Sequence, residues 1–523
     1  MRLSLPGGMR LTGWRAAAVP VLVITTLVAL LLGLLGWLPG QRSAAASAPT
    51  ASSGAPSATS AASASSTGAP SDGLAPAVLL PVGSAAPLPT TAGLAEALRS
   101  LLASANLGHH VGGAVVDLAT GRLVFGSAED DAFSPASTIK LLTATAALDT
   151  LGPDFRIQTK VVVGSTPGQV VLVGGGDPTL ATSAPAGFVP APASLTTLAA
   201  RTAAALRASG VTTVSLGYDS TLFTGPVKAP TWPQTYLTTG VVSAVTALSV
   251  DEGRVGPIVE GISPRFANPP LAAAGAFARR LVALGIKVVG LPSPVTAPKG
   301  TAPSLSPTGA AAPGASAAAS RVSPSPASAE APGATLAVVA SPTLSDLVGW
   351  MLSASDNDLA EAVARLTALH EGRSPDFDGA IETVSDVVGS LGVPVSGVKM
   401  YDGSGLTGST QVSPAVLAAI LALADSASHP TLRPLLTGMA VAGFSGSLTD
   451  RFWDTTTRSA AGLVRAKTGT LSAVSAIAGT VVDADGRELG FVFLADQVPP
   501  GGTTAARESL DRLVAAVAGC GCR

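Results

Sequence analysis

The chain is best traced from the sequence Ser134-Pro135-Ala136-Ser137-Thr138-Ile139-Lys140-Leu141-Leu142. Pro135 suits the first turn of a helix, and Ser134 before it suits the N-cap. The alanine- and leucine-rich residues that follow predict a helix to about Leu148. This helix would place a serine and a lysine three residues apart on one face, inside its first turn.

Ser137 and Lys140 are suited to act as a nucleophile and its base. A serine hydroxyl is a poor nucleophile until a base takes its proton, and burial among apolar side chains can lower the pKa of a lysine amine enough to do so. A helix N-terminus also supplies N–H groups where an oxyanion would develop. Because this spacing is common by chance, a capped helix with an exposed lysine is the alternative for the pair alone.

Two further triplets strengthen the first interpretation. Ser355-Asp356-Asn357 lies in the break between helices predicted over 344–353 and 359–369. Lys467-Thr468-Gly469 opens a predicted strand. Either triplet alone is compatible with a helix cap or an ordinary edge strand. All three motifs in this order, each in a suitable local structure, indicate an active site with a serine nucleophile.

The second triplet carries groups for proton transfer. The Asn357 amide could donate to a substrate carbonyl and accept a hydrogen bond from Lys140. The Ser355 hydroxyl could relay a proton toward a leaving group. We therefore assign Ser355 and Asn357 to the catalytic set.

The third triplet carries groups for substrate binding. Lys467 and Thr468 would offer a cation and a hydroxyl to a carboxylate. Gly469 would let a ligand backbone lie close along the strand edge. The N–H of Thr470, together with that of Ser137, could form an oxyanion hole.

Composition excludes several other functions. The 523 residues contain 31 Lys+Arg against 33 Asp+Glu, so no strongly basic face is predicted and nucleic acid is not an expected partner. The histidines lack a metal-ligand spacing, and we predict no metal and no organic cofactor. The length suggests two or three domains.

The N-terminus predicts export. Arg2, Arg10 and Arg15 precede an uncharged, mostly apolar run of 23 residues, Ala16–Leu38, which is long enough to span a bilayer. The arginines would stay in the cytoplasm and the rest of the chain would lie outside. We expect one N-terminal membrane helix, with a signal peptide cleaved near Ala44–Ala46 as the alternative.

Low-complexity segments divide the remainder of the chain. Residues 41–84 are rich in Ala, Ser, Pro and Thr and predict a flexible tether with a reach of roughly 35–40 Å. Short strands and helices after about residue 157 predict an inserted segment, because the first two motifs must converge across it. The predicted parts are an anchor or signal peptide over 1–40, a linker over 41–84, a domain of α/β (α+β) class formed by 85–156 and 335–523, inserted smaller domains over 157–297, and a low-complexity loop over 298–334.

The only cysteines are Cys520 and Cys522, in a Cys-Gly-Cys sequence. A bridge between residues this close would be strained, and two ligands do not make a metal site. We expect a structural role for them, with pairing to another chain as the alternative in an exported protein.

With its three motifs placed, the chain resembles the low-molecular-mass class C penicillin-binding proteins, the D-alanyl-D-alanine carboxypeptidase/endopeptidase family. The likeness covers roughly residues 90–523, and the long insertion between the first two motifs is typical of that family. The resemblance implies a penicillin-binding/β-lactamase-like transpeptidase domain, with an antiparallel sheet between helices, plus inserted domains.

The resemblance also implies roles for the motif residues. Ser137 would be acylated by a peptide ending in D-Ala-D-Ala, with Lys140 as the base, and Lys467 and Thr468 would hold the terminal carboxylate. The expected partners are the peptide stems and cross-links of peptidoglycan, with β-lactams as inhibitors. Some family members bind the free amino end of the peptide through an acidic residue shortly after a tryptophan. Here Trp232 is followed by Pro233-Gln234-Thr235-Tyr236-Leu237, which contains no acid.

Two other functions fit parts of this pattern. A β-lactamase would share the motifs and deacylate rapidly, so it would turn over a fluorescent penicillin that a peptidase retains as a long-lived adduct. A non-catalytic cell-wall-binding homologue would form no adduct. The presence of Ser137, Lys140, Asn357 and Lys467 together favours an enzyme over the latter.

Overall fold

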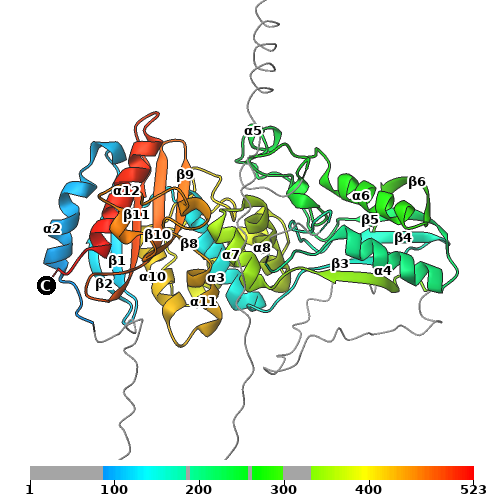
Figure 1. Ribbon diagram of the computed structural model, residues 1–523, viewed down its shortest axis with the longest axis horizontal. Helices are drawn as coiled ribbons and strands as arrows, with labels where there is room; N and C mark the ends of the chain where they lie inside the picture. Colours follow the sequence, from blue (N-terminus) through cyan, green and yellow to red (C-terminus); the bar gives the residue numbers. More distant parts are fainter. Residues whose placement is uncertain (1–85, 184–188, 257–261, 299–330, 523) are drawn as a thin grey trace, which may run out of the picture. The chain divides into compact units, whose positions relative to one another are not determined.

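The structure is a computed structural model that describes residues 86–183, 189–256, 262–298 and 331–522 (Figure 1). The apolar run Ala16–Leu38 and the linker over 41–84 lie outside these residues, as does most of the 298–334 loop. In the described part of the chain, no single helix has both the length and the apolar composition of a membrane span. The helices Pro414–Asp425 and Pro430–Thr437 have the length and composition of a span only when they are counted together, and they are bent by 110° at the break between them.

A six-stranded antiparallel sheet forms the first layer of the fold. At its centre, the first strand of the described fold pairs with the last. β1 lies antiparallel to β11, with Val111 opposite Ala495 and Asp117 opposite Leu489. The first two strands form an antiparallel hairpin, and the last three form an antiparallel meander. In sheet order the strands are β2 (Arg122–Ser127), β1 (Val111–Asp117), β11 (Glu488–Ala495), β10 (Val474–Val482), β9 (Val464–Leu471) and β8 (Ala440–Val441).

Helices cover both faces of this sheet, as expected for the fold class. Along β11, Phe491 and Phe493 belong to the core shared with α2 (Thr91–Leu102) and α12 (Thr503–Ala518). The alternate residues Val492 and Leu494 belong to the core shared with α10 (Pro414–Asp425). Successive strand residues point to opposite faces, so a strand that is apolar throughout must be covered on both sides.

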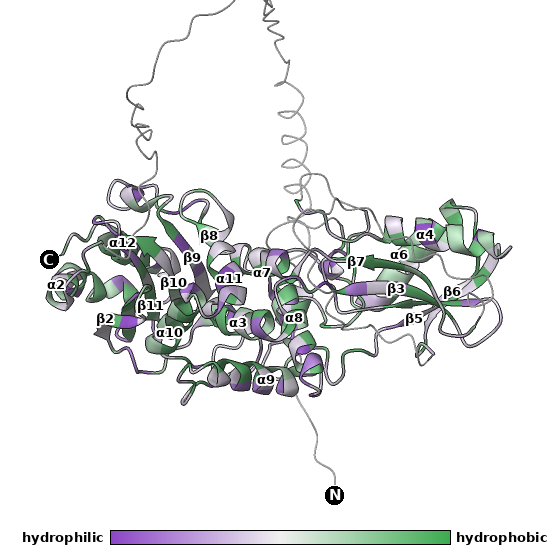
Figure 2. Ribbon diagram, turned by 90° about the horizontal axis from the view of Figure 1, so that it is seen from below, coloured by the Kyte–Doolittle hydropathy of each residue, from purple (hydrophilic) through white to green (hydrophobic). Residues whose placement is uncertain are grey.

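A second, mixed sheet is built from the inserted segment. In sheet order its strands are β6 (Lys287–Pro294), β5 (Thr213–Asp219), β4 (Gln169–Val173), β3 (Gln158–Val163) and β7 (Thr335–Ala340). Figure 2 shows α4 (Leu195–Ala208) and α6 (Pro269–Ala283) on the same face of it, where Leu198 and Phe277 share one core. The sequence placed 335–340 in the first domain, but β7 pairs with β3, so this strand belongs with the inserted segment. The other domain boundaries stay predictions.

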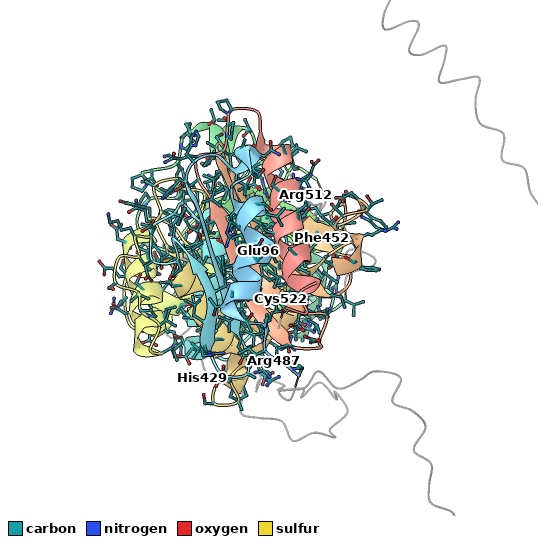
Figure 3. All side chains as sticks on the ribbon, turned by 90° about the vertical axis from the view of Figure 1, so that its left-hand side faces the viewer. Glu96, His429, Phe452, Arg487, Arg512 and Cys522 are labelled. Carbon is teal, nitrogen blue, oxygen red and sulfur yellow. A yellow bond between two sulfur atoms is a disulfide. The ribbon has the colours of Figure 1, made fainter. Side chains whose placement is uncertain are left out.

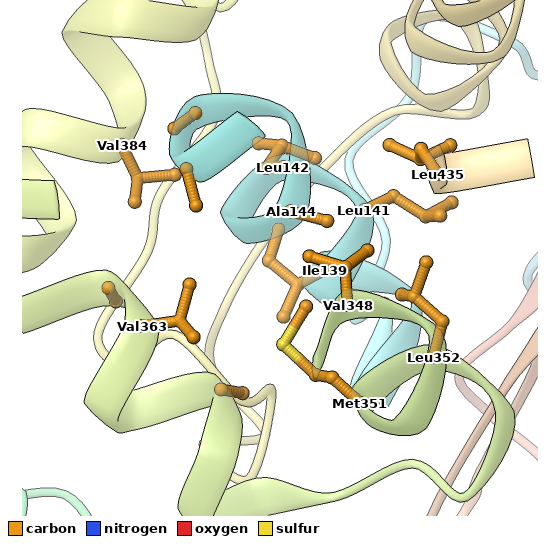
Figure 4. Close-up of a cluster of buried hydrophobic side chains, with 14 of the residues drawn as sticks. Ile139, Leu141, Leu142, Ala144, Val348, Met351, Leu352, Val363, Val384 and Leu435 are labelled. Carbon is orange, nitrogen blue, oxygen red and sulfur yellow. The ribbon is translucent and has the colours of Figure 1, made fainter. Parts of the chain in front are cut away.

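A group of helices packs together around the first two motifs, which lie at the N-termini of α3 and α8. These helices are α3 (Lys140–Leu151), α7 (Leu344–Ser353), α8 (Asn357–His370), α9 (Phe377–Ser390) and α11 (Arg433–Thr437). Figure 4 shows their shared core, in which Ile139, directly before α3, lies near Val348 and Met351 of α7. The sequence analysis predicted α7 and α8 but not α9. This core fixes α3 and α8 against each other and thereby the residues at their N-termini.

The start of the nucleophile helix differs from the prediction. Residues Ala136–Ile139 form a 3₁₀ turn and the α-helix begins only at Lys140, so Ser137 lies in the turn before the helix. The buried Ser134 hydroxyl has no hydrogen-bond partner among the described residues, and it caps no helix. Instead the Ser134 N–H donates to Asp496 Oδ2 over 2.9 Å, which ties this stretch to the end of β11.

The structure also corrects the expectation for the cysteines, because Cys520 and Cys522 are joined in a disulfide. Their Cα atoms are 5.0 Å apart, which lies within the range that disulfides span. Figure 3 labels Cys522 beside α2, and its carbonyl accepts a hydrogen bond from the N–H of Thr90, the N-cap of that helix, over 2.7 Å. The end of the chain therefore packs against the beginning of the described fold.

Candidate active site

The amine of Lys140 meets the hydroxyl of Ser137. Lys140 Nζ lies 2.9 Å from Ser137 Oγ, and the lysine side chain is fully buried at the N-terminus of α3. Ser137 itself is half-buried, and its hydroxyl also donates to the Ser404 carbonyl over 3.3 Å. The 3₁₀ turn keeps the two residues, three apart in sequence, on the same side of the backbone.

Two further acceptors orient the Lys140 amine. Asn357 Oδ1 accepts from Nζ over 2.8 Å, and the Ser404 carbonyl accepts over 2.5 Å. A charged ammonium has three N–H donors and so satisfies all three oxygens. A neutral amine has two, and when these go to Asn357 and Ser404 its lone pair points at the Ser137 hydroxyl. The structure therefore brings Ser137, Lys140 and Asn357 together.

Burial changes the acidity of this lysine. Desolvation lowers the pKa of Lys140 from its ordinary value to about 8, because the charged form loses its hydration. The nearby carboxylates act in the opposite direction, Asp402 most strongly and then Glu361, Asp356 and Asp358. With a pKa of about 8, about one tenth of the amine is neutral at pH 7, which is far more than for a lysine in water.

The second motif lies at the junction between α7 and α8. Asp356 Oδ1 accepts from the Leu359 N–H over 2.8 Å and caps α8, which starts at Asn357. Ser355 has a φ of 62°, in a region that residues with a side chain rarely adopt and that is often found at active sites. Within the described residues, no hydrogen bond joins the Ser355 hydroxyl to Ser137 or Lys140. The structure thus brings Asn357 into the site directly and Ser355 only to its neighbourhood.

The third motif lies on β9. Lys467 is fully buried and its Nζ donates to the carbonyl of Thr468 over 2.6 Å. Burial lowers the pKa of Lys467 well below its ordinary value, and the charge of Lys140 adds to this lowering. The two amines therefore lie close enough to influence each other. The Thr468 hydroxyl donates over 2.8 Å to Ser447, a residue that no sequence motif indicated.

Gly469 has a packing role that the sequence analysis did not identify. A Cβ atom at this position would lie 2.5 Å from the carbonyl oxygen of Pro135 and 3.1 Å from the Cβ of Ala136. Glycine at this position lets β9 lie against the turn that carries Ser137. This packing contact explains the glycine directly, without the ligand backbone that the sequence analysis invoked. Thr470, the next residue, is exposed.

The Ser404 carbonyl is held by a network of buried carboxylates. Asp402 is completely buried and accepts from the Gly405 N–H over 2.6 Å, from the Thr407 N–H over 2.8 Å and from Trp232 Nε1 over 2.8 Å. This stretch belongs to none of the three sequence motifs. Trp232 is itself buried against it, which places the tryptophan behind the site.

Glu361 supports the same turn from α8, one helical turn after Asn357. Its Oε2 accepts from the Gly403 N–H over 3.2 Å, whereas the buried Oε1 has no hydrogen-bond partner among the described residues. Burial, and then the charge of Asp402, raise the pKa of Glu361 to about 7. Two carboxyl groups thus flank the backbone whose carbonyl receives the Lys140 amine.

A group of three carboxylates lies beside the second motif. One oxygen from each of Glu252, Asp356 and Asp358 lies within 4.8 Å of the others. Two arginines contact them: Arg254 Nε is 2.8 Å from Glu252 Oε2, and Arg265 Nη2 is 3.0 Å from Asp358 Oδ2. The guanidinium groups supply positive charge to this cluster, and we read it as an ion-pair network.

Comparison with known families adds to this geometry. A family model described as the D-Ala-D-Ala carboxypeptidase 3 (S13) family matches residues 94–288 and 321–517. The chain is similar to the carboxypeptidase DacB of Mycolicibacterium smegmatis, with 34% identity over 98% of this chain and 100% of the relative. It is also similar to a carboxypeptidase of Mycobacterium tuberculosis, with 33% identity over 85% of this chain and 87% of the relative.

A solved structure supports the same relationship at the level of the fold. Penicillin-binding protein 4 of Haemophilus influenzae matches with a TM-score of 0.60 and 19% identity. The match covers 80% of this chain and 98% of the other. The two proteins therefore share a penicillin-binding fold with inserted domains, as the sequence motifs implied.

Proposed function

Because this chain belongs to the D-Ala-D-Ala carboxypeptidase 3 (S13) family, we propose that it is a serine-type D-alanyl-D-alanine carboxypeptidase and endopeptidase acting on peptidoglycan peptides through an acyl-enzyme on Ser137. The observation that carries the proposal is the amine of Lys140, placed 2.9 Å from Ser137 Oγ with two further acceptors that direct its lone pair there.

Acylation starts with the neutral form of Lys140. Its amine takes the Ser137 proton while Oγ attacks the carbonyl carbon of the penultimate D-alanine. The N–H groups of Ser137 and Thr470 are the proposed donors to the resulting oxyanion. Collapse of the tetrahedral intermediate breaks the C–N bond, and the proton passes to the leaving amine from Lys140 or through Ser355. Terminal D-alanine leaves and the peptide remains as an ester on Ser137.

Substrate selection rests on the third motif. A terminal carboxylate placed beside Lys467 and Thr468 would receive a charge-assisted hydrogen bond from each. Burial disfavours the charged form of Lys467 in the free protein, and an anion beside it would favour that form. The motif therefore selects ligands that bring a carboxylate, which peptides ending in D-alanine and β-lactams share.

The acyl-enzyme then reacts with water. The same amine of Lys140, once neutral, can take a proton from the attacking water and return the serine hydroxyl. A β-lactam forms the same ester on Ser137 but keeps its leaving group attached, so it blocks the site for water. We expect a long-lived adduct with penicillin rather than turnover.

The direct test is the release of D-alanine from a soluble peptide that ends in D-Ala-D-Ala. The wild-type protein should release one D-alanine per peptide, and Ser137→Ala should release none, since loss of the nucleophile costs several powers of ten. A peptide ending in L-Ala-L-Ala serves as the control substrate. Release by Ser137→Ala at the wild-type rate would contradict the proposal.

We also propose that the protein works outside the cytoplasmic membrane, held by one N-terminal helix or released after cleavage. The support is the apolar run Ala16–Leu38 behind three arginines and the linker over 41–84. Fractionation of cells that produce the full chain should place it with membranes or in the exported fraction. A variant that lacks residues 1–40 should remain in the cytoplasm.

A further inference from the structure

The orientation of the Asn357 amide matters for the proposed reaction. Its oxygen must face Lys140, because an amide NH₂ would meet the N–H groups of the amine instead of accepting from them. The other end of the amide fixes this orientation, because Asn357 Nδ2 donates over 3.2 Å to the carbonyl of Val241. Val241 belongs to the inserted segment, so a residue outside the three motifs decides which end of the amide meets the lysine.

Arg265 holds the segment that supplies this carbonyl. Its Nε donates over 3.3 Å to the carbonyl of Gly240, the residue directly before Val241, and its Nη1 donates over 2.5 Å to the carbonyl of Glu252. Its Nη2 lies 3.0 Å from Asp358 Oδ2, in the first turn of α8 directly after Asn357. One guanidinium therefore ties the peptide before Val241 to the helix turn that carries Asn357.

The ion pair in this tie is buried. The Arg265 side chain is 4% exposed and that of Asp358 is 7% exposed, so their ion pair is largely shielded from water. The other oxygen of Asp358 accepts from the Ser243 N–H over 2.7 Å, two residues after Val241. The carbonyl of Val241 thus lies between two attachments to the same aspartate.

From this arrangement we propose that Arg265 is a positioning residue for acylation, which acts by holding the Val241 carbonyl against the Asn357 amide and so turning the Asn357 oxygen toward Lys140. The inference rests on the proposed function, because it concerns the reaction at Ser137. It adds a residue of the inserted segment to a site that the motifs place on other elements. Arg265 touches neither substrate nor the reacting atoms in this assignment.

A double-mutant cycle tests the inference. The variants are Arg265→Met, which keeps the length of the stem and removes the guanidinium, Asn357→Ala, and the double variant. The readout is the second-order rate constant for acylation by a fluorescent penicillin. Arg265→Met should lower this constant about tenfold or more, and the double variant should be no slower than Asn357→Ala, because Arg265 acts through that amide.

Two outcomes would overturn the inference. If Arg265→Met is acylated at the wild-type rate, Arg265 has no positioning role. If the fold-losses in the acylation constant of the two single variants multiply in the double variant, Arg265 acts independently of Asn357, as a purely structural residue would. If the wild-type protein itself forms no adduct, the proposed function fails instead, so the two failures are distinguishable.

Controls separate positioning from folding. Arg279→Met removes an exposed arginine of α6, in the same inserted segment, and should leave the acylation constant within about twofold of wild type. Thermal unfolding of each variant shows whether it is folded. If Arg265→Met does not fold, Arg265→Lys replaces it: the ammonium can pair with Asp358 but cannot also reach both carbonyls, so acylation should still fall while the fold is retained.

Discussion

Lys140 combines two properties that a base for Ser137 needs. Burial removes the hydration that favours its charged form, and the acceptors at Asn357 and Ser404 take the remaining N–H groups. Neither property follows from the motif alone, since an exposed lysine in the same spacing would keep an ordinary pKa. At the scale of single residues, a buried amine lies beside one hydroxyl while two fixed oxygens accept its other hydrogen bonds.

The pH dependence of acylation should therefore report on Lys140. The reactive form is the neutral amine, so the rate constant for acylation by penicillin should rise with pH and level off above an inflection near 8, where the amine loses its proton. Rapid-mixing measurements from pH 6 to pH 10, with the protein shown to be folded at each pH, give this profile. A rate constant that is still rising steeply at pH 10, as the ordinary lysine pKa of about 10.4 would require, would contradict the assignment.

Glu361 should shift this profile. Its carboxylate raises the pKa of Lys140, and Glu361 itself has a pKa of about 7, so it is mostly charged where Lys140 titrates. Glu361→Gln removes that charge and keeps an oxygen for the Gly403 N–H. We expect the inflection of the acylation profile to move to lower pH. As the control, Glu96→Gln at an exposed position of α2 should leave the inflection at its wild-type pH. An inflection that moves to higher pH in Glu361→Gln would contradict the electrostatic account.

At the scale of elements, the contact between β9 and the turn before α3 assembles the site. β9 carries the third motif, and the approach of Gly469 to Pro135 brings that motif to the nucleophile. Because the backbone carbonyl of Pro135 would lie 2.5 Å from an added Cβ, the strand and the turn must separate to accept any side chain there.

Gly469→Ala should therefore impair the site more than the fold. Overpacking of this kind costs about 1–3 kcal/mol, and most of it should appear as displacement of Thr468 and Lys467 from Ser137. We expect at least a tenfold loss in penicillin acylation, measured beside the melting temperature. Gly275→Ala in α6, where a Cβ meets only the end of Arg279 at 3.6 Å, is the matched control and should be neutral or stabilising.

The sequence predicted most of the elements but not how they pair. The helices predicted over 344–353 and 359–369 correspond to α7 (Leu344–Ser353) and α8 (Asn357–His370). The predicted domain boundary at residue 335 separated β7 from the inserted segment, because nothing in six residues says which sheet they join, whereas β7 pairs with β3. The helix start was misplaced because the same residues suit a 3₁₀ turn and an α-helical turn.

From the sequence, only side chains that stand in motifs could be proposed for the site. Ser137, Lys140, Asn357 and Lys467 stand in recognisable motifs. The carbonyls of Ser404 and Val241 could not be predicted, because every residue has a carbonyl and only the fold decides which one meets the lysine or the amide. Ser447 and Arg265 likewise belong to no motif, and their roles follow only from contacts between distant segments.

At the scale of the whole molecule, α8 connects the inserted segment with the helices around the nucleophile. Arg365 of α8 is 1% exposed and donates to the carbonyls of Thr224 over 3.0 Å, Pro226 over 3.1 Å and Pro375 over 3.3 Å. Its guanidinium also lies 4.3 Å from the centre of the Phe377 ring. One buried side chain thus satisfies backbone groups of the inserted segment and of the loop before α9.

Arg365→Met should destabilise the folded protein markedly. The substitution removes three hydrogen bonds that a charged guanidinium donates to backbone carbonyls, and hydrogen bonds to charged groups contribute about 1.5–3 kcal/mol each, so we expect the free energy of unfolding to fall by about 3 kcal/mol or more. Urea titration followed by circular dichroism gives this value. Arg99→Met removes an arginine from an exposed ion pair and should change it by less than about 0.5 kcal/mol. Equal effects of the two substitutions would contradict the structural role of Arg365.

The central claim is that Ser137 is a nucleophile activated by Lys140, and intact-mass spectrometry after incubation with benzylpenicillin tests it most directly. The account predicts a mass increase of one penicillin per chain, located on the peptide that contains Ser137, and no increase in Ser137→Ala. An adduct that persists in Ser137→Ala, or its absence in the folded wild-type protein, would contradict the account.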